Sequence, residues 1–133
     1  MAGDRGLEIQ TREGLNELDV GDWTGLGFAA VQLNPSYKTW NQARSLARVP
    51  GGESMLEVQA RMIAVLEEIR RAHPDGAVAI VSHGDPIKSA LLYLLGLSLD
   101  AYSRIEVEPG SISTVLVGDW GAKLLRLNEV VRP

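Results

Sequence analysis

Apolar residues recur at three- and four-residue spacing between positions 53 and 73, and this pattern predicts one amphipathic helix. The apolar positions are Met55, Val58, Met62, Val65, Leu66 and Ile69. The opposite face carries Glu57, Arg61, Glu67, Glu68, Arg70 and Arg71. A helix of this kind packs its apolar face on a core, and the Pro74 and Gly76 that follow it are residues that end helices.

A second pattern leads from an apolar segment through a histidine into a helix. Residues 77–81 (AVAIV) form a continuous apolar run after a Pro-Asp-Gly turn, which predicts a buried strand. The pair His83-Gly84 follows, Asp85 is a good N-cap residue, and the next helix is expected to end at Gly96. This order places His83 at the carboxyl end of a strand, where ligands bind in open α/β sheets.

The remaining segments predict an α/β fold in one domain covering residues 1–133, with a C-terminal third that is mostly β. The predicted strands there span 104–108, 111–117 and 123–127, and a Gly118–Gly121 turn joins the last two. Before the long helix, the pattern predicts a short strand over 7–9 and short helical pieces over 28–33 and 36–47.

Composition narrows the class of protein. With 133 residues, 45% hydrophobic and 23% charged, the chain has the composition of a soluble globular protein, and no segment approaches the roughly 20 apolar residues of a membrane span. It has no cysteine and shows no secretory signal, which favours the cytoplasm. The net charge of −4 and the lack of a Lys/Arg cluster argue against a nucleic-acid partner. A small ligand or a protein partner is expected.

The His83-Gly84 corner is suited to bind a phosphoryl group. A helix N-terminus offers unpaired backbone N–H groups and a positive dipole end, and a histidine beside it donates hydrogen bonds or carries positive charge. A histidine after a buried strand also occurs simply because it bonds a neighbouring backbone group, and the residues alone leave both interpretations open. The charge of Asp85 would repel a phosphate unless its carboxylate turns onto the N–H groups that it caps.

A second candidate lies in the stretch LNELDVGDWTGL, residues 15–26. It places Glu17 four residues before Gly21, and two glycines with Trp23 favour a tight, ordered loop. A lone glutamate in a loop is usually just solvated. Held near the histidine corner, Glu17 could instead donate a proton, with its pKa raised by burial and by the negative charge of a phosphate.

Three motifs, ELDVGDWTG, PGGES and VSHGDPIKSALLYLLGL, stand in an order and at a spacing that resembles the histidine phosphatase superfamily, the phosphoglycerate-mutase-like proteins. The resemblance runs from about Gly6 to Asn128 and includes EPGSIST. It implies a three-layer α/β sandwich and hydrolysis of a phosphorylated small molecule through a phosphohistidine, without a cofactor. Hydrolysis is favoured over mutase chemistry because the motifs resemble the phosphatase members more closely.

The resemblance also implies roles for individual residues. His83 matches the second active-site histidine, which stabilises the phosphoryl group, and Glu17 matches the acid that protonates the leaving oxygen and then activates water. Gly84 and Asp85 match the pair whose backbone lies against the phosphate. Glu53 matches an acidic position near the mouth of the site, where substrate contact and a helix N-cap role are equally open. No spacing of acids and histidines indicates a metal site.

One part of the family's machinery has no match in this sequence. The nucleophile there is a histidine in an Arg-His-Gly motif at the end of the first, central strand, and a second arginine completes the phosphate pocket. The other histidine of this chain is His73, in front of Pro74 and outside any such motif, where a solvated helix end is expected. The resemblance therefore implies a sandwich that is incomplete, with its first central strand absent.

An absent strand would leave the 77–81 segment with an unpaired apolar edge. We expect the chain to cover this edge as a homodimer, as a swapped oligomer, or by binding a fragment that supplies the strand. Three interpretations stay open: part of a phosphomonoesterase, an inactive module that binds a phosphorylated ligand, and an oligomeric remnant of the family. The substrate is not specified, although the expected lid over 27–48 offers Tyr37, Lys38, Trp40 and Arg44 as contacts.

Overall fold

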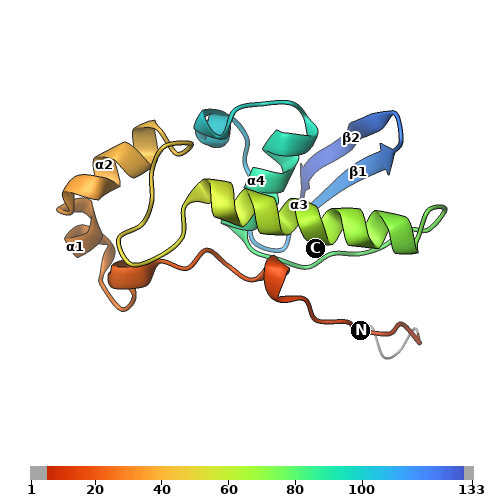
Figure 1. Cartoon of the computed structure of the whole chain (residues 1–133), viewed down its shortest axis with the longest axis horizontal. Helices are drawn as coiled ribbons and strands as arrows, with labels where there is room; N and C mark the ends of the chain where they lie inside the picture. The colour runs from red at the N-terminus through yellow and green to blue at the C-terminus, as the bar shows by residue number, and fades with distance from the viewer. Residues whose placement is uncertain (1–5, 131–133) are drawn as a thin grey trace.

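The computed structural model describes residues 6–130 and has an α/β architecture, an incomplete sandwich. The helices are α1 (Phe28–Gln32), α2 (Pro35–Gln42), α3 (Met55–Ala72) and α4 (Gly84–Leu94). Short 3-10 turns form at η2 (Glu13–Leu15), η3 (Gly21–Trp23) and η4 (Leu99–Arg104). The strands are β1 (Ile112–Gly118) and β2 (Gly121–Glu129). Figure 1 shows α3 along the long axis, α1 and α2 at one end, and the two strands toward the other.

The long helix predicted over 53–73 is confirmed, and its start is fixed by a capping box. The Ser54 hydroxyl accepts a hydrogen bond from the Glu57 N–H at 3.3 Å, and the Glu57 carboxylate accepts one from the Ser54 N–H at 2.8 Å. Ser54 is therefore the N-cap of α3. The N-cap role that was open for Glu53 is wrong, because Glu53 precedes the cap and its side chain bonds elsewhere.

The buried core lies between the first half of α3, α4 and the loops before α3. Its members are Leu18, Trp23, Trp40, Ala47, Val49, Met55, Val58, Leu92 and Leu99. Trp23 and Trp40 meet edge to face, with ring centroids 6.0 Å apart, a favoured aromatic geometry. The core thus gathers where the two candidate motifs converge, and it fixes the loops that carry them.

The C-terminal hairpin forms as predicted from alternation and turn residues. β1 and β2 pair antiparallel from Ile112↔Glu129 to Gly118↔Gly121. The strands predicted over 7–9 and 104–108 are wrong, since neither segment joins a sheet in the described part of the chain. In the segment 104–108, η4 ends at Arg104, and residues 105–108 run on without a ladder partner among the described residues.

The segment 77–81 departs from its predicted burial. It runs extended into α4, but within residues 6–130 no strand pairs with it, and Val78 and Val81 are 46% and 88% exposed. The prediction of a buried strand is wrong for this chain because burial of such a segment requires neighbouring strands and a helix on each face. Together with the free edge of β1, it leaves the sandwich open.

A groove of about 550 Å³ lies between this segment, β1 and the two long helices; its lining is mostly apolar, and Glu67, Arg70, His73 and Asp75 also line it. Val78 and Ile80 line it from the extended segment, and Val115 and Val117 line it from β1. The second half of α3 and the end of α4 contribute Ile63, Leu66, Ile69, Tyr93 and Leu94. The apolar residues in the first half of α3 therefore pack in the core, and those in its second half line an open groove.

No helix among the described residues is both long enough and apolar enough to cross a membrane.

Leu92 on α4 tests the packing of the core. Its side chain is fully buried, so Leu92→Ala should lower the free energy of unfolding by about 2–5 kcal/mol through lost burial and a residual cavity. Leu46→Ala is the matched control, because Leu46 is 84% exposed and should change it by about 0.5 kcal/mol or less. Urea unfolding of both variants measures the difference, and equal effects would contradict this core.

Candidate functional site

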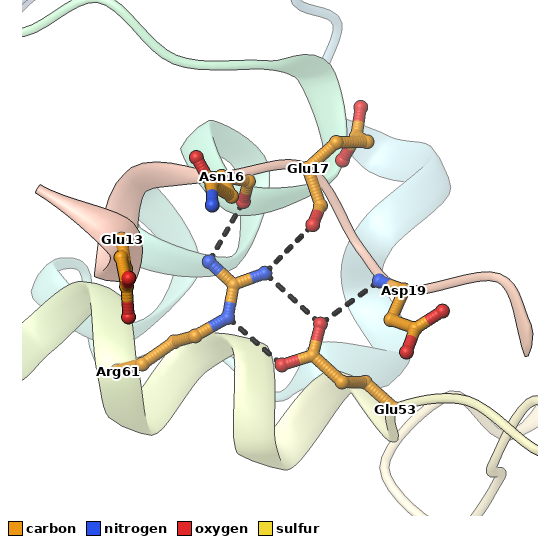
Figure 2. Close-up of a pocket in the computed structure, with 6 residues that line it drawn as sticks. All are labelled: Glu13, Asn16, Glu17, Asp19, Glu53 and Arg61. Atoms are coloured by element: carbon orange, nitrogen blue, oxygen red, sulfur yellow. Dashed lines mark hydrogen bonds and ion pairs between the residues drawn. The ribbon is translucent and has the colours of Figure 1, made fainter.

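Arg61 of α3 organises the loop that carries Glu17. Its guanidinium donates to the carbonyl oxygens of Gly14 at 2.9 Å, Asn16 at 2.7 Å and Glu17 at 3.0 Å. Figure 2 shows the guanidinium directed into the curve of this loop. The Glu17 carboxylate points to the opposite side, away from Arg61. Arg61 thus fixes the backbone of the loop and makes no hydrogen bond to the Glu17 carboxylate.

Glu53 anchors Arg61 in turn. Its two carboxylate oxygens accept from the Arg61 guanidinium at 2.9 and 3.0 Å, a bidentate pair. One of them also accepts from the Asp19 N–H at 2.9 Å. The bond from Arg61 lowers the pKa of Glu53, so the carboxylate is ionised at neutral pH. These groups line a pocket of about 320 Å³ together with Glu13, Asn16 and Glu17 (Figure 2).

The loops ELDVGDWTG and PGGES pack backbone against backbone. Gly21 has a φ of +45°, and a Cβ there would lie 2.3 Å from the Pro50 carbonyl oxygen. At Gly52, a Cβ would lie 2.2 Å from the Asp19 carbonyl oxygen. Hydrogen bonds from Asp22 N–H to Pro50 and from Glu53 N–H to Asp19 close the contact at 2.8 and 3.0 Å. Only glycines permit this approach, and the loop is as tight as its sequence suggests.

The structure brings Glu17 and His83 together. The Nδ1 atom of His83 lies 4.0 Å from Oε2 of Glu17, while Oε1 of Glu17 accepts from the Leu18 N–H at 2.8 Å. Beside them, the Ser82 hydroxyl donates to the Leu15 carbonyl at 2.7 Å and joins the histidine corner to the loop. Both side chains remain accessible, with 45% of Glu17 and 57% of His83 exposed, so a ligand can reach them.

The environment raises the pKa of the Glu17 carboxyl. Partial burial is the largest cause, and the negative charge of Asp85 adds to it. The Leu18 N–H, His83 and Arg61 oppose the shift because each favours the ionised carboxylate. An acid with a raised pKa retains its proton to a higher pH, which suits a proton donor.

Asp85 does not cap α4, and that prediction is wrong. His83 is the N-cap and Asp85 lies in the first turn, where its carboxylate accepts a hydrogen bond from the Tyr102 hydroxyl. The Arg44 guanidinium approaches the same oxygen at 3.5 Å. The N-cap makes no side-chain hydrogen bond, so no side chain blocks the N–H groups of Gly84 and Asp85 in this way. The carboxylate thus contacts Tyr102 and Arg44 and does not cap the helix end.

Two residues of the expected lid, Trp40 and Arg44, pack against aromatic rings. Trp40 is a core residue, and Arg44 lies between the rings of Trp40 and Tyr102. The described residues contain no group of three potential metal ligands. His73 ends α3, far along that helix from the core, and is exposed.

Sequence reasoning missed Arg61, Ser82 and Tyr102 as parts of the site. The periodicity places Arg61 on the polar face of its helix, and the one local signal for its role is its position two turns after Glu53. Ser82 adjoins the histidine but bonds a residue 67 positions away. Tyr102 lies in η4 and reaches Asp85 across 17 positions, a contact for which the sequence has no local pattern.

Comparison with known proteins identifies the family. The model of the histidine phosphatase superfamily (branch 1) matches residues 1–130, and the chain belongs to this superfamily. It is 27% identical over 126 residues to phosphoserine phosphatase 1 of Hydrogenobacter thermophilus, covering 93% of this chain and 60% of that protein. It is 35% identical over 127 residues to a bifunctional protein of Mycobacterium tuberculosis, Rv2228c, covering 91% of this chain and 34% of that one.

The fold agrees with this assignment. The solved structure of YhfR from Bacillus stearothermophilus superposes with a TM-score of 0.90 at 25% identity, over 98% of this chain and 66% of that one. The architecture is therefore phosphoglycerate-mutase-like, as the motifs implied. The chain spans about a third to two thirds of the lengths of these relatives.

The raised pKa of Glu17 predicts a stability effect with a definite sign. The folded state holds the proton more tightly than the unfolded chain, so stability falls as pH rises from about 4.5 through the folded pKa. Glu17→Gln should therefore raise Tm at pH 7 and have little effect below pH 4, because the carboxyl is then protonated in both states. Thermal unfolding at the two pH values measures this, and a lower Tm at pH 7 would contradict it.

Glu53→Gln serves as the opposite control for this measurement. Its lowered pKa means that its contribution is present above about 4.5 and is lost as pH falls through the folded pKa. The free energy of unfolding of this variant should be lower than that of the wild type by about 1 kcal/mol at pH 7 and by less at pH 3.

Proposed function

We propose that this chain supplies the proton donor and the phosphate-binding helix end of a phosphomonoester hydrolase. The observation that carries the proposal is the approach of Glu17 to His83 at the uncapped amino end of α4. A phosphate there would accept from the N–H groups of Gly84 and Asp85 and from the His83 ring. Glu17 would protonate the leaving oxygen and then take a proton from the attacking water. The name of one relative, a phosphoserine phosphatase, supports the class of reaction.

The proposed mechanism needs a nucleophile in addition to this acid. His83 cannot readily act as both nucleophile and charge stabiliser, and His73 ends α3 away from the corner. We therefore place the nucleophile on a histidine outside these 133 residues, at the end of a strand that pairs with residues 77–81. Superfamily membership supports this assignment, since the phosphohistidine mechanism is the one that the motifs imply.

The apolar groove supports a strand as the occupant. Two extended segments border it, 77–81 and β1, and in the described chain each has an edge with unpaired N–H and C=O groups. Such edges bind an added strand through main-chain hydrogen bonds, and the apolar lining takes alternate side chains of that strand. A strand parallel to 77–81 would end beside His83, because parallel strands have their carboxyl ends at the same edge. That position suits delivery of a nucleophile.

Complementation tests the function. The chain is mixed with a separately expressed N-terminal fragment of a full-length superfamily member that carries the Arg-His-Gly strand, and p-nitrophenyl phosphate turnover is measured. We expect turnover only in the mixture, and a loss of at least about 100-fold with His83→Ala. Turnover that survives His83→Ala, or its absence from a mixture in which the two pieces bind, would contradict the proposed site.

Two controls keep the outcome clear. A fragment whose Arg-His-Gly histidine is replaced by alanine should bind equally well without turnover. Light scattering of the chain alone should give a dimer or larger oligomer that covers the groove, and the fragment should dissociate it. Phosphate binding without turnover in any mixture would favour the inactive binding module instead.

A further inference from the structure

Asp85 presents an electrostatic problem for a phosphate at the amino end of α4. Its carboxylate lies in the first turn of the helix, two residues after His83, and a negative charge there opposes an incoming anion. The same charge acts on Glu17, whose pKa it helps to raise. The side chain is only 24% exposed, so water screens this charge less than it would at the surface.

Two groups contact this carboxylate, which makes no hydrogen bond to the N–H groups of the helix end. The Tyr102 hydroxyl donates to Oδ1, and Nη1 of Arg44 lies 3.5 Å from the same oxygen. Burial and the bond to Asp85 raise the pKa of Tyr102, so its hydroxyl stays protonated as a donor. Tyr102 is therefore neutral, and Arg44 is the cation in direct contact with Asp85.

Arg44 is held in place from several sides. Its guanidinium carbon lies 3.7 Å from the centre of the Tyr102 ring and 4.8 Å from that of Trp40, and its side chain is 12% exposed. The next residue, Ser45, donates from its N–H and its hydroxyl to the two carboxylate oxygens of Asp100 at 2.9 and 2.8 Å. Asp100 and Tyr102 both belong to η4, so one short element positions both Arg44 and the hydroxyl.

We propose that Arg44 is a positioning residue that compensates the charge of Asp85, so that an anion can bind at the amino end of α4 beside an aspartate. The proposal rests on the proposed function in one respect, the anion at that helix end. The compensation itself involves Arg44 and Asp85, which this chain contains, and does not require a bound anion. Arg44 contacts Asp85 directly, and Lys88, which pairs with Glu106, lies on the other partner of Asp85 at 4.5 Å from the centre of the Tyr102 ring. The charges that act on Glu17 come from Asp85, His83 and Arg61.

Removing the positive charge of Arg44 should change the pKa of Glu17 measurably. In Arg44→Met the side chain keeps an unbranched apolar stem but loses its charge, so the uncompensated Asp85 should raise the pKa of Glu17 further. The same change in an Asp85→Asn background should leave Glu17 unaffected, because no carboxylate remains to be compensated. Arg44→Lys keeps a cation, so the pKa of Glu17 in this variant should be close to its wild-type value. A purely structural role for Arg44 would not produce this dependence on residue 85.

The experiment follows the Glu17 side-chain carboxyl by ¹³C NMR against pH in wild type, Arg44→Met, Asp85→Asn, the double variant and Arg44→Lys. The proposal requires a shift with Arg44→Met that disappears in the double variant. An equal shift in both backgrounds, or none in either, overturns it. Thermal unfolding of each variant checks that the fold is intact, and Arg44→Gln, which also removes the positive charge, takes the place of Arg44→Met in both backgrounds if that variant does not fold.

A second arm separates this proposal from the proposed function. Inorganic phosphate is titrated into the same variants, and the Gly84 amide is followed by ¹⁵N NMR. Arg44→Met should weaken phosphate binding roughly tenfold, and the added Asp85→Asn should restore it. If no variant binds phosphate, the proposed function fails, whereas the Glu17 titration still decides whether Arg44 compensates Asp85.

Discussion

The mostly buried guanidinium of Arg61 holds the candidate site together. Arg61 donates to three backbone carbonyls of the loop that carries Glu17 and to both oxygens of Glu53. A loop of this kind has little regular structure, so its carbonyls need an external donor to fix their positions. Because Arg61 comes from the middle of α3, the most regular element of the chain, it transmits the rigidity of a helix to the loop that carries the acid.

The histidine side of the site depends on a different set of contacts. α4 starts at the corner, packs on α3 through Leu92, and is joined to the Glu17 loop by the bond from Ser82 to Leu15. The two halves of the site thus meet over one core. The unpaired segment 77–81 lies directly before this corner, so whatever strand pairs with it will also affect the position of His83.

Local sequence patterns predicted the parts of the fold that depend on local interactions. The periodicity of α3 and the turn between β1 and β2 are determined by residues close in sequence, and both elements formed as expected. The motifs also identified Glu17 and His83, and the structure places them 4.0 Å apart. The burial of 77–81 could not be predicted from this sequence, because it depends on a neighbouring strand that is not among the described residues.

The position of Asp85 shows the same limit at a single residue. Its residue type and its place in the sequence favour an N-cap role, but its carboxylate contacts Tyr102 and Arg44 instead of capping the helix. Both partners come from segments distant in sequence. The capping preference is worth about 1 kcal/mol, which a hydrogen bond to an ionised group together with a nearby cation can exceed.

The most direct test of this account is the proximity of Glu17 and His83 when Arg61 is changed. Nuclear Overhauser contacts between the Glu17 side chain and the His83 ring should be present in the wild-type chain. They should disappear in Arg61→Met, while contacts between α3 and α4 persist. Retention of the Glu17–His83 contacts without Arg61 would contradict the claim that this guanidinium holds the site in place.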